Sequence, residues 1–188
     1  MIASYLITSP THYSRNPITL RVKLEEVLMR KRVTMACLRD KNANNYPELA
    51  RVFVQTLNSF RVKSIMHSDI SLALNLSAYG VHLPFSLVKN THEAKKKGLF
   101  VIVSTHNEED ALYAQSLGAD AVTFSPIFDT PNKGAPVGLE KLKEIIGILS
   151  IDVFALGGII SKTHIGLCEQ AGAAGFASIR YFLPPLKR

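Results

Sequence analysis

Cysteine is scarce in this chain of 188 residues, which holds only two, Cys37 and Cys168. They lie far apart, with no CxxC or metal-type spacing, so neither a structural zinc site nor a disulfide framework is expected. Long apolar runs are missing as well, because no stretch approaches the roughly 20 consecutive apolar residues that span a bilayer. The amino terminus lacks the basic start and apolar core of a signal peptide. These absences favour a cytoplasmic protein with no membrane partner.

The chain also lacks a cluster of basic residues, although its net charge is +7. The Lys and Arg residues are dispersed, and the densest group, Lys95 to Lys97, stands just before Gly98, as expected for the end of a helix. Nucleic-acid binding normally needs basic residues gathered on one element. We therefore expect no nucleic-acid partner, and the basic balance suits an enzyme of phosphorylated small molecules.

Linkers, low-complexity tracts and breaks in composition are absent too, so residues 1–188 are expected to form one domain. The chain is 47% hydrophobic, which is ample for one core. Eight short runs are rich in β-branched or aromatic residues: SYLITS, TMACL, KSIMH, GVHL, LFVIVS, AVTFS, DVFAL and GFASI. Stretches of helical periodicity separate most of them, for example Leu20, Leu24 and Val27. Strand and helix alternating eight times predict an α/β fold, a compact TIM (β/α)8 barrel.

The ends of the helices carry signals of their own. Asn45 followed by Pro47 predicts a helix start, and Thr105 with Glu108 has the spacing of a capping box. After the eighth strand only residues 181–188 remain, and a Pro-Pro pair among them cannot continue a helix. We expect the last helix to be truncated or missing. The thin flank that this leaves offers a place for a partner subunit, so a homodimer is one possibility.

In such a barrel, ligands bind at the carboxyl ends of the strands, which form one rim. The residues that follow the strands there include four basic groups, several hydroxyls and a Gly-Gly pair: Ser9, Arg39, Lys41, His67, Ser68, Ser104, His106, Ser125, Thr130, Lys133, Gly157, Gly158 and Arg180. Glycine lets backbone N–H groups approach an anion, and barrels of this kind often bind phosphate with the loops after strands seven and eight. The LGGI and SIR segments of those loops therefore predict a phosphate site.

Four segments resemble the thiamine phosphate synthase and TenI (thiazole tautomerase) family: AYGVHL, the long stretch from Val103 to Ile145, ALGGI and EQAGAAGFASI. This resemblance implies a TIM barrel. It also implies one of two activities. The synthases of the family join a pyrimidine methyl pyrophosphate to a thiazole phosphate and release pyrophosphate with magnesium assistance. TenI instead aromatises a thiazole precursor phosphate without a metal.

The resemblance assigns several residues to the pyrophosphate of the pyrimidine substrate. CLRDK is similar to the family's Q-x-R-E-K stretch, which places Arg39 and Lys41 where a synthase grips pyrophosphate. Thr130 and Lys133 match the T-x-[ST]-K loop that holds the same group, with Asn132 in place of the usual hydroxyl residue.

Other matching segments concern the second substrate and the reacting centre. Ser104 and His106 fall on the serine and the histidine of the family's VSxH segment. Gly157 and Gly158 match the pair whose backbone N–H groups receive the thiazole phosphate. Arg180 stands where a synthase has a small serine, and we expect it to pair with a phosphate or carboxylate.

The chain departs from the synthase pattern at both magnesium ligands. His67 and Ser68 stand where a synthase has Asn-Asp, and the GVHLPFSL segment lacks the acid that follows strand four. Because Mg²⁺ prefers charged oxygen ligands, a hydroxyl does not replace a carboxylate. Asp69, one position along, either compensates or is a first-turn acid of a helix. No metal site and no firm cofactor are therefore predicted, and Mg²⁺ is needed only if the chain is a synthase.

The missing aspartates and the VHLP segment resemble TenI, yet Pro126 occupies the position of TenI's acid/base histidine. His67, His82 and His106 are all expected near strand ends on the same rim, and histidine suits proton transfer near neutral pH. His82 has a second interpretation as a packed core residue. We expect His106 or His67 to be the catalytic group.

Three functional hypotheses remain. The leading one is a divergent TenI-like protein that binds a phosphorylated thiazole-type ligand and transfers protons without a metal. The alternative is a magnesium-dependent thiamine phosphate synthase. The second alternative is a non-catalytic ligand-binding or regulatory protein.

Overall fold

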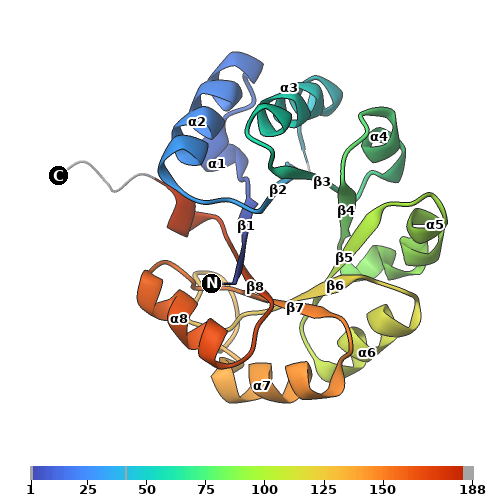
Figure 1. The fold of residues 1–188 in the computed structure, drawn as a ribbon, viewed down its shortest axis with the longest axis vertical. Helices are drawn as coiled ribbons and strands as arrows, with labels where there is room; N and C mark the ends of the chain where they lie inside the picture. Colours follow the sequence, from blue (N-terminus) through green and yellow to red (C-terminus); the bar gives the residue numbers. More distant parts are fainter. Residues whose placement is uncertain (1, 41, 184–188) are drawn as a thin grey trace.

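The computed structural model of the protein describes residues 2–40 and 42–183. These residues form a closed barrel of eight parallel strands, each paired with the next in chain order, with β8 closing on β1. The strands are β1 (Ala3–Ile7), β2 (Met35–Leu38), β3 (Lys63–His67), β4 (Gly80–Leu83), β5 (Phe100–Thr105), β6 (Ala121–Phe124), β7 (Asp152–Leu156) and β8 (Gly175–Ser178). Every strand falls on a run predicted from the sequence, and Figure 1 shows them ringed by helices. The predicted TIM barrel is confirmed.

Helices cover the outside of the barrel between successive strands. They are α1 (Pro10–Tyr13), α2 (Pro17–Arg30), α3 (Tyr46–Ser59), α4 (Ile70–Asn75), α5 (Thr91–Lys96), α6 (Glu108–Ser116), α7 (Gly138–Ile148) and α8 (Lys162–Gln170), with the short 3-10 helices η1 (Phe85–Asn90) and η2 (Arg180–Phe182). The periodicity expected over residues 20–27 is confirmed by α2, whose apolar side is buried. Helix α3 starts as predicted, although the Asn45 amide donates to the Arg15 carbonyl at 3.0 Å instead of capping the helix.

The predicted capping box is wrong. Helix α6 begins at Glu108 behind Asn107, whose side-chain oxygen accepts from the Asp110 N–H at 2.8 Å. Thr105 instead ends β5, where its hydroxyl donates to the Thr123 carbonyl at 3.2 Å. Pairing with β6 extends the strand through the position that the local signal assigned to the helix cap.

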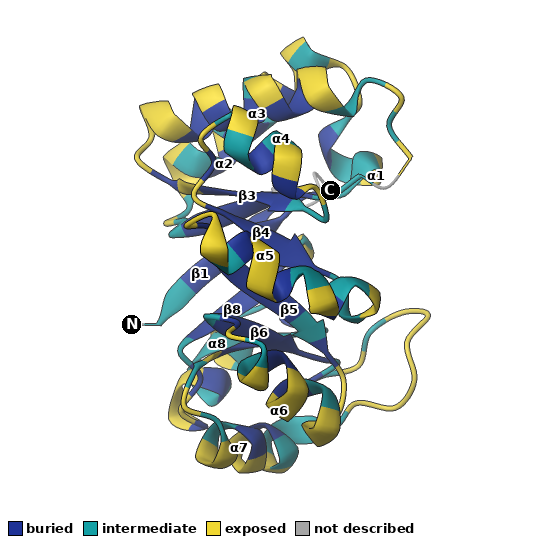
Figure 2. Ribbon diagram, turned by 90° about the vertical axis from the view of Figure 1, so that its right-hand side faces the viewer, coloured by how far each residue is buried: buried dark blue, intermediate teal, exposed yellow. Residues whose placement is uncertain are grey.

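The core has two layers, because successive side chains of each strand point to opposite faces. One layer fills the barrel itself: Tyr5, Ile7, Met35, Cys37, Ile65, Ile102, Ala121, Phe154 and Ala177. The other lies between the sheet and the helices and includes Leu6, Ala36 and Val101. Figure 2 shows the buried strands in dark blue and the exposed outer faces of the helices in yellow. A polar residue on the inward face near a carboxyl end therefore opens toward the centre of the rim.

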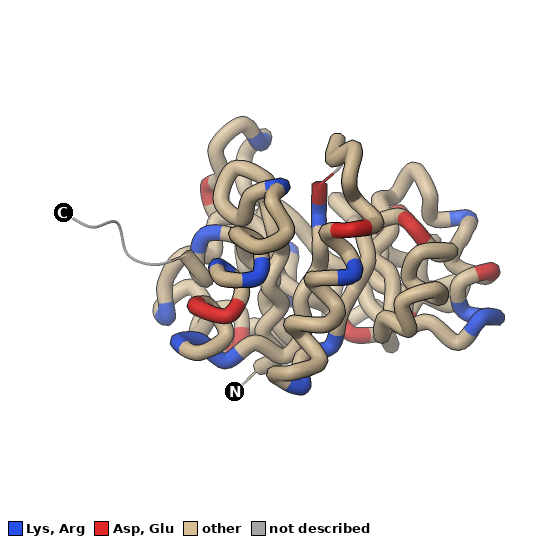
Figure 3. The backbone as a smooth tube through the Cα atoms, turned by 90° about the horizontal axis from the view of Figure 1, so that it is seen from above, with Lys and Arg blue, Asp and Glu red and all other residues tan. Residues whose placement is uncertain are grey.

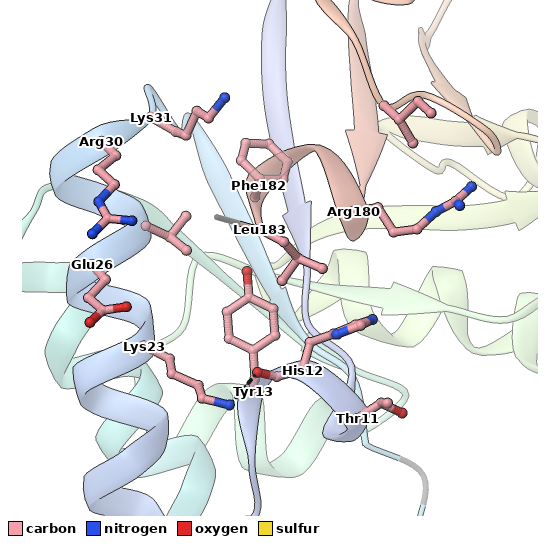
Figure 4. Close-up of a pocket in the computed structure, with 12 residues that line it drawn as sticks. Thr11, His12, Tyr13, Lys23, Glu26, Arg30, Lys31, Arg180, Phe182 and Leu183 are labelled. Atoms are coloured by element: carbon pink, nitrogen blue, oxygen red, sulfur yellow. Dashed lines mark hydrogen bonds between the residues drawn. The ribbon is translucent and has the colours of Figure 1, made fainter. Parts of the chain in front are cut away.

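The flank after β8 is thin, as predicted. Within the described residues only the single turn of η2 follows β8, and Pro184 and Pro185 lie outside them. A hollow of about 620 Å³ lies beside this turn, between α1 and α2. Figure 4 shows Tyr13, Phe182 and Leu183 bordering it.

Basic side chains are dispersed over the surface (Figure 3), as expected from the sequence. Figure 3 shows Lys and Arg scattered over several helices and loops. Among residues 2–40 and 42–183 we find no helical segment with the length and hydrophobicity that crossing a bilayer requires.

Candidate active site

The Gly157-Gly158 pair follows β7 and shapes one side of the rim. Both residues have positive φ, +98° and +67°, which residues with a side chain rarely adopt. A Cβ on Gly158 would lie 2.5 Å from the Asp129 carbonyl oxygen, and the Phe128 N–H donates to the Gly157 carbonyl at 3.1 Å. The segment after β6 therefore lies directly on the glycines, and only glycine allows this approach.

A cavity of about 260 Å³ opens against this pair. It is lined by Ser9, His12, Thr130, Pro131, Leu156, Gly157, Gly158, Ile159, Ala177, Ser178, Ile179 and Arg180. The structure thus brings together four predicted site residues, which we name the glycine half of the rim: Thr130, Gly157, Gly158 and Arg180. Lys133 is not among the lining residues. Ser178 lines it as part of the SIR segment that the sequence indicated, whereas His12 is a lining residue that the sequence did not indicate.

Two hydroxyls of this cavity brace its backbone. The Thr130 hydroxyl donates to the Phe128 carbonyl at 2.8 Å. The Ser178 hydroxyl donates to the Ile159 carbonyl at 2.7 Å. Because both protons are used internally, the polar groups left to a ligand in this cavity are backbone groups and the side chains of Ser9, His12 and Arg180.

Three predicted cations of the site lack an acidic partner. Among the described residues, no acidic side chain forms an ion pair with Arg39, Lys133 or Arg180. Arg15, by contrast, is held to Asp40 at 2.6 Å. Uncompensated positive charge on a rim favours anionic ligands. Arg39 is half-buried, whereas Lys133 and Arg180 are exposed; Lys41 lies outside the described residues.

The opposite side of the rim carries a polar network on inward positions of three strands. His67 of β3 and His82 of β4 are in register, and their ring centroids lie 6.2 Å apart. His82 Nε2 lies 2.9 Å from the Ser104 hydroxyl, and its Nδ1 lies 2.9 Å from the Tyr5 hydroxyl. We name Arg39, His67, His82 and Ser104 the histidine half of the rim. Tyr5, its partner inside the barrel, was not indicated by the sequence.

His82 is a buried neutral histidine. Burial, together with the neighbouring charges of His67 and Arg39, lowers its pKa to about 3. Burial also raises the pKa of Tyr5 well above its usual value, with the neighbouring Cys37 thiol adding to the effect. Neither group changes its charge near pH 7. His82 is therefore buried, as its packed-core interpretation expects, and neutral near pH 7.

His106 and His67 occupy positions from which a proton can be moved. His106 is exposed beyond β5, with Nδ1 at 2.9 Å from the Ser125 carbonyl oxygen. Donation from Nδ1–H to that carbonyl leaves Nε2 as a proton acceptor. His67 is half-buried, and its Nδ1 lies 2.9 Å from the Ser68 hydroxyl.

The carboxylates near the rim do not assemble a magnesium site. Asp69 is the N-cap residue of α4, and its carboxylate accepts from the Leu72 N–H at 2.8 Å. Asp40 is occupied by Arg15. The described part of the chain contains no group of three or more His, Cys, Asp or Glu residues that could hold a metal ion. These residues do not fit a resident Mg²⁺.

Comparison with known proteins gives consistent matches over nearly the whole chain. The model of the family described as thiamine monophosphate synthase matches residues 4–182. A protein of Aquifex aeolicus, provisionally named thiamine-phosphate synthase 2, is 34% identical over 95% of this chain and 96% of its own. The thiamine-phosphate synthase of Syntrophomonas wolfei is 30% identical over 93% of this chain and 85% of its own. The solved thiamine phosphate pyrophosphorylase of Pyrococcus furiosus superposes with a TM-score of 0.79 at 25% identity, covering 95% of this chain and 85% of that one.

Proposed function

The chain belongs to the thiamine monophosphate synthase family, and from this premise we propose that it joins a pyrimidine methyl pyrophosphate to a thiazole phosphate. The names of its relatives support the synthase over the TenI-like tautomerase. They reverse the order in which the sequence ranks these two hypotheses. The observation that carries the proposal is a rim with a glycine-built cavity on one half and, on the other, Arg39, which forms no ion pair within the described residues. Two anionic substrates need two such anion sites.

The proposed chemistry is a substitution at the methylene carbon of the pyrimidine. Its C–O bond to pyrophosphate breaks, and a bond from that carbon to the thiazole ring nitrogen forms. Negative charge grows on the leaving pyrophosphate, where Arg39 and Lys133 supply stabilising positive charge. The thiazole phosphate lies in the glycine half against Gly157, Gly158 and Arg180.

Magnesium enters this proposal as a component of the pyrophosphate substrate. Asp69 caps a helix and Asp40 pairs with Arg15, so this proposal assigns neither carboxylate to the ion. Arg39 and Lys133 supply part of the positive charge that a magnesium ion held by two aspartates would supply in a synthase.

The direct test is to incubate the purified protein with both substrates and magnesium and to detect thiamine phosphate by mass. Product formation supports the proposal. Measurable binding of thiazole phosphate without product contradicts it, and would leave the tautomerase or a ligand-binding protein. An Arg39→Ala variant provides the matched negative control, because it removes positive charge from the histidine half and leaves the glycine half intact.

The tautomerase is the second candidate, and the geometry of His106 favours it. With Nδ1 donating to the Ser125 carbonyl, Nε2 can take a proton from a thiazole precursor. Aromatisation of that precursor, followed by absorbance, is expected to vanish in His106→Gln if this activity is the true one. A wild-type protein that is inactive in this assay excludes the candidate.

We also propose that α2 pairs with a second copy of the chain. Its outward face exposes Ile18, Val22 and Met29 by 76%, 49% and 70%, a stripe opposite its buried side. In an antiparallel pair of α2 helices, the register that brings Ile18 to the partner subunit's Met29 brings Arg21, which pairs with Glu25 of its own helix at 2.8 Å, to the partner subunit's Glu26. Sedimentation is expected to give a dimer for the wild type and a monomer for Val22→Glu. A wild-type monomer at micromolar concentration contradicts this pairing.

A further inference from the structure

A chain of three polar side chains crosses the interior of the barrel. Tyr5 of β1 is fully buried and His82 of β4 is 4% exposed, whereas Ser104 of β5 is half-buried and reaches the rim. Both contacts of the His82 ring are 2.9 Å, with Tyr5 at Nδ1 and Ser104 at Nε2. The network therefore runs from the closed interior to the place where substrate binds.

The direction of the hydrogen bonds follows from what each group can donate. Neutral His82 carries one N–H, so either Nδ1 or Nε2 is protonated. Protonation at Nδ1 would turn the Tyr5 hydroxyl into an acceptor, and its own proton would then face the neighbouring Cys37 thiol, which is a weak acceptor. Protonation at Nε2 lets Tyr5 donate to Nδ1 and gives every buried proton a strong acceptor. The second arrangement is favoured, since an unsatisfied buried hydroxyl costs free energy.

We propose that Tyr5 locks His82 as the Nε2–H tautomer and that His82 thereby acts as a positioning residue for Ser104. Because the Ser104 oxygen accepts from Nε2–H, its own proton cannot point back into the barrel and is directed toward an acceptor atom of the bound substrate. Ser104 becomes an oriented hydrogen-bond donor. The functional consequence rests on the proposed synthase activity, whereas the tautomer itself does not.

The tautomer can be measured without any substrate. In a long-range ¹⁵N–¹H spectrum of the full chain labelled at its six histidines, the His82 ring is identified by its loss in His82→Gln. We expect Nε2 to resonate as a protonated nitrogen and Nδ1 as an unprotonated one, unchanged from pH 5.5 to pH 8. An Nδ1–H pattern, or a ring that becomes doubly protonated within this range, overturns the proposal even if the protein is an active synthase.

Kinetics tests the route through Ser104. Tyr5→Phe keeps the ring but removes the lock, and we expect kcat to fall about tenfold, the effect of losing one oriented hydrogen bond, with KM nearly unchanged. In a Ser104→Ala background the same Tyr5→Phe change should have no further effect on kcat, because the group on which it acts is gone. Independent, multiplicative losses would overturn the relay.

A separate control variant tests whether the loss of a buried tyrosine hydroxyl by itself disturbs the protein. Tyr13→Phe is the matched control, since Tyr13 is 2% exposed and its hydroxyl has no hydrogen-bond partner in the described structure. It lies outside the barrel interior and should leave kcat unchanged. Thiazole phosphate affinity, which reports on the glycine half, should be unchanged in Tyr5→Phe. If that affinity collapses, the substitution has disturbed the fold, and the test passes to the folded Ser104→Ala variant, which keeps Tyr5. Its His82 ring should still be protonated at Nε2, and protonation at Nδ1 would overturn the proposal.

Discussion

The two halves of the rim are built from different parts of the chain. The glycine half is shaped by backbone, because Gly157 and Gly158 adopt positive φ and the segment after β6 lies on them. The histidine half is shaped by side chains, with His82 fixed by contacts of 2.9 Å on both ring nitrogens. The glycine half depends on residues that lack a Cβ, and the histidine half depends on particular side-chain atoms.

This difference explains why the halves can diverge separately. A backbone-built anion site tolerates side-chain changes around it as long as the two glycines remain. A side-chain site changes its chemistry with one substitution, and here Ser68 stands where the resembling synthases carry an acid. Loops of a barrel are held independently by the strands. In the proposed synthase, phosphate binding can therefore persist while the handling of the leaving group changes.

The largest expected effect comes from adding one methyl group to the glycine half. In Gly158→Ala the new Cβ would lie 2.5 Å from the Asp129 carbonyl oxygen at a φ of +67°. We expect thiazole phosphate affinity to fall at least about 100-fold and stability to fall by about 2 kcal/mol or more. Calorimetric titration and urea unfolding measure the two effects.

The matched control for this variant is Gly147→Ala in α7. A Cβ at Gly147 meets nothing within 4 Å, and alanine in a helix interior is more stable than glycine by about 0.5–1 kcal/mol. Binding should be unchanged. If Gly158→Ala binds thiazole phosphate as well as Gly147→Ala does, the glycine half is not built by backbone.

A crossed pair of arginine variants tests whether the halves serve different substrates. Arg39→Ala should raise KM for the pyrimidine pyrophosphate about 10- to 100-fold, because it removes an unpaired cation from that half. Arg180→Ala should weaken thiazole phosphate binding by a similar factor. Each variant should change the affinity for the other ligand by no more than about twofold.

Arg51→Ala controls for the loss of net charge, since Arg51 is an exposed residue of α3. Initial rates and calorimetry at fixed ionic strength give all four affinities. An Arg180→Ala protein with unchanged affinity for thiazole phosphate removes Arg180 from the site. Equal loss of both ligands in either variant would mean that the rim is one continuous anion site.

The glycine half could be predicted from the sequence for the same reason that it is robust. Only glycine adopts positive φ without cost, so a Gly-Gly pair after a strand carries its geometry in its residue type. The strands were predictable as well, because a parallel sheet covered by helices makes every strand an apolar run. Both signals are local in sequence.

The histidine half needed the closed barrel. Tyr5 and His82 are 77 residues apart, and they meet only because β1 and β4 both turn those side chains inward. Thr105 shows the same limit, since pairing with β6 overrode its local capping signal. Registers across a sheet depend on tertiary packing, which no window of the sequence contains.

A smaller effect is expected from placing an acid at residue 68, next to His67 of the histidine half. Ser68 has a φ of +66°, a conformation that Asp and Asn tolerate better than most residues. In Ser68→Asp we expect the magnesium concentration for half-maximal synthase activity to fall about three- to tenfold, because a carboxylate adds a charged oxygen ligand. Ser68→Asn has nearly the same shape without the charge and should show no such change. Equal magnesium dependence in both variants would place residue 68 outside any ion-binding position.

The last expected effect is a pH dependence of stability that comes from His82. Its pKa is lowered to about 3 in the folded protein by burial and by the facing charges of His67 and Arg39. The unfolded chain therefore binds a proton that the folded protein excludes between about pH 6.5 and pH 3. Stability from this group is complete above pH 6.5 and is lost as the pH falls, with a slope approaching about 1.4 kcal/mol per pH unit.

Urea unfolding of the wild type and of His82→Gln at pH 7.5, 6.0 and 5.0 isolates this contribution. Glutamine does not titrate, so the variant should lose less stability than the wild type between pH 6.5 and pH 5. The lowered pKa of Asp40, caused by its hydrogen bonds from Arg15, acts in a different window, since a carboxylate contributes stability that is lost only as the pH falls below about 4. Parallel stability curves for the two proteins above pH 5 would mean that His82 is protonated in the folded state. In that case the interior of the histidine half is open to water, and the His82 side chain is not held as a fixed neutral group.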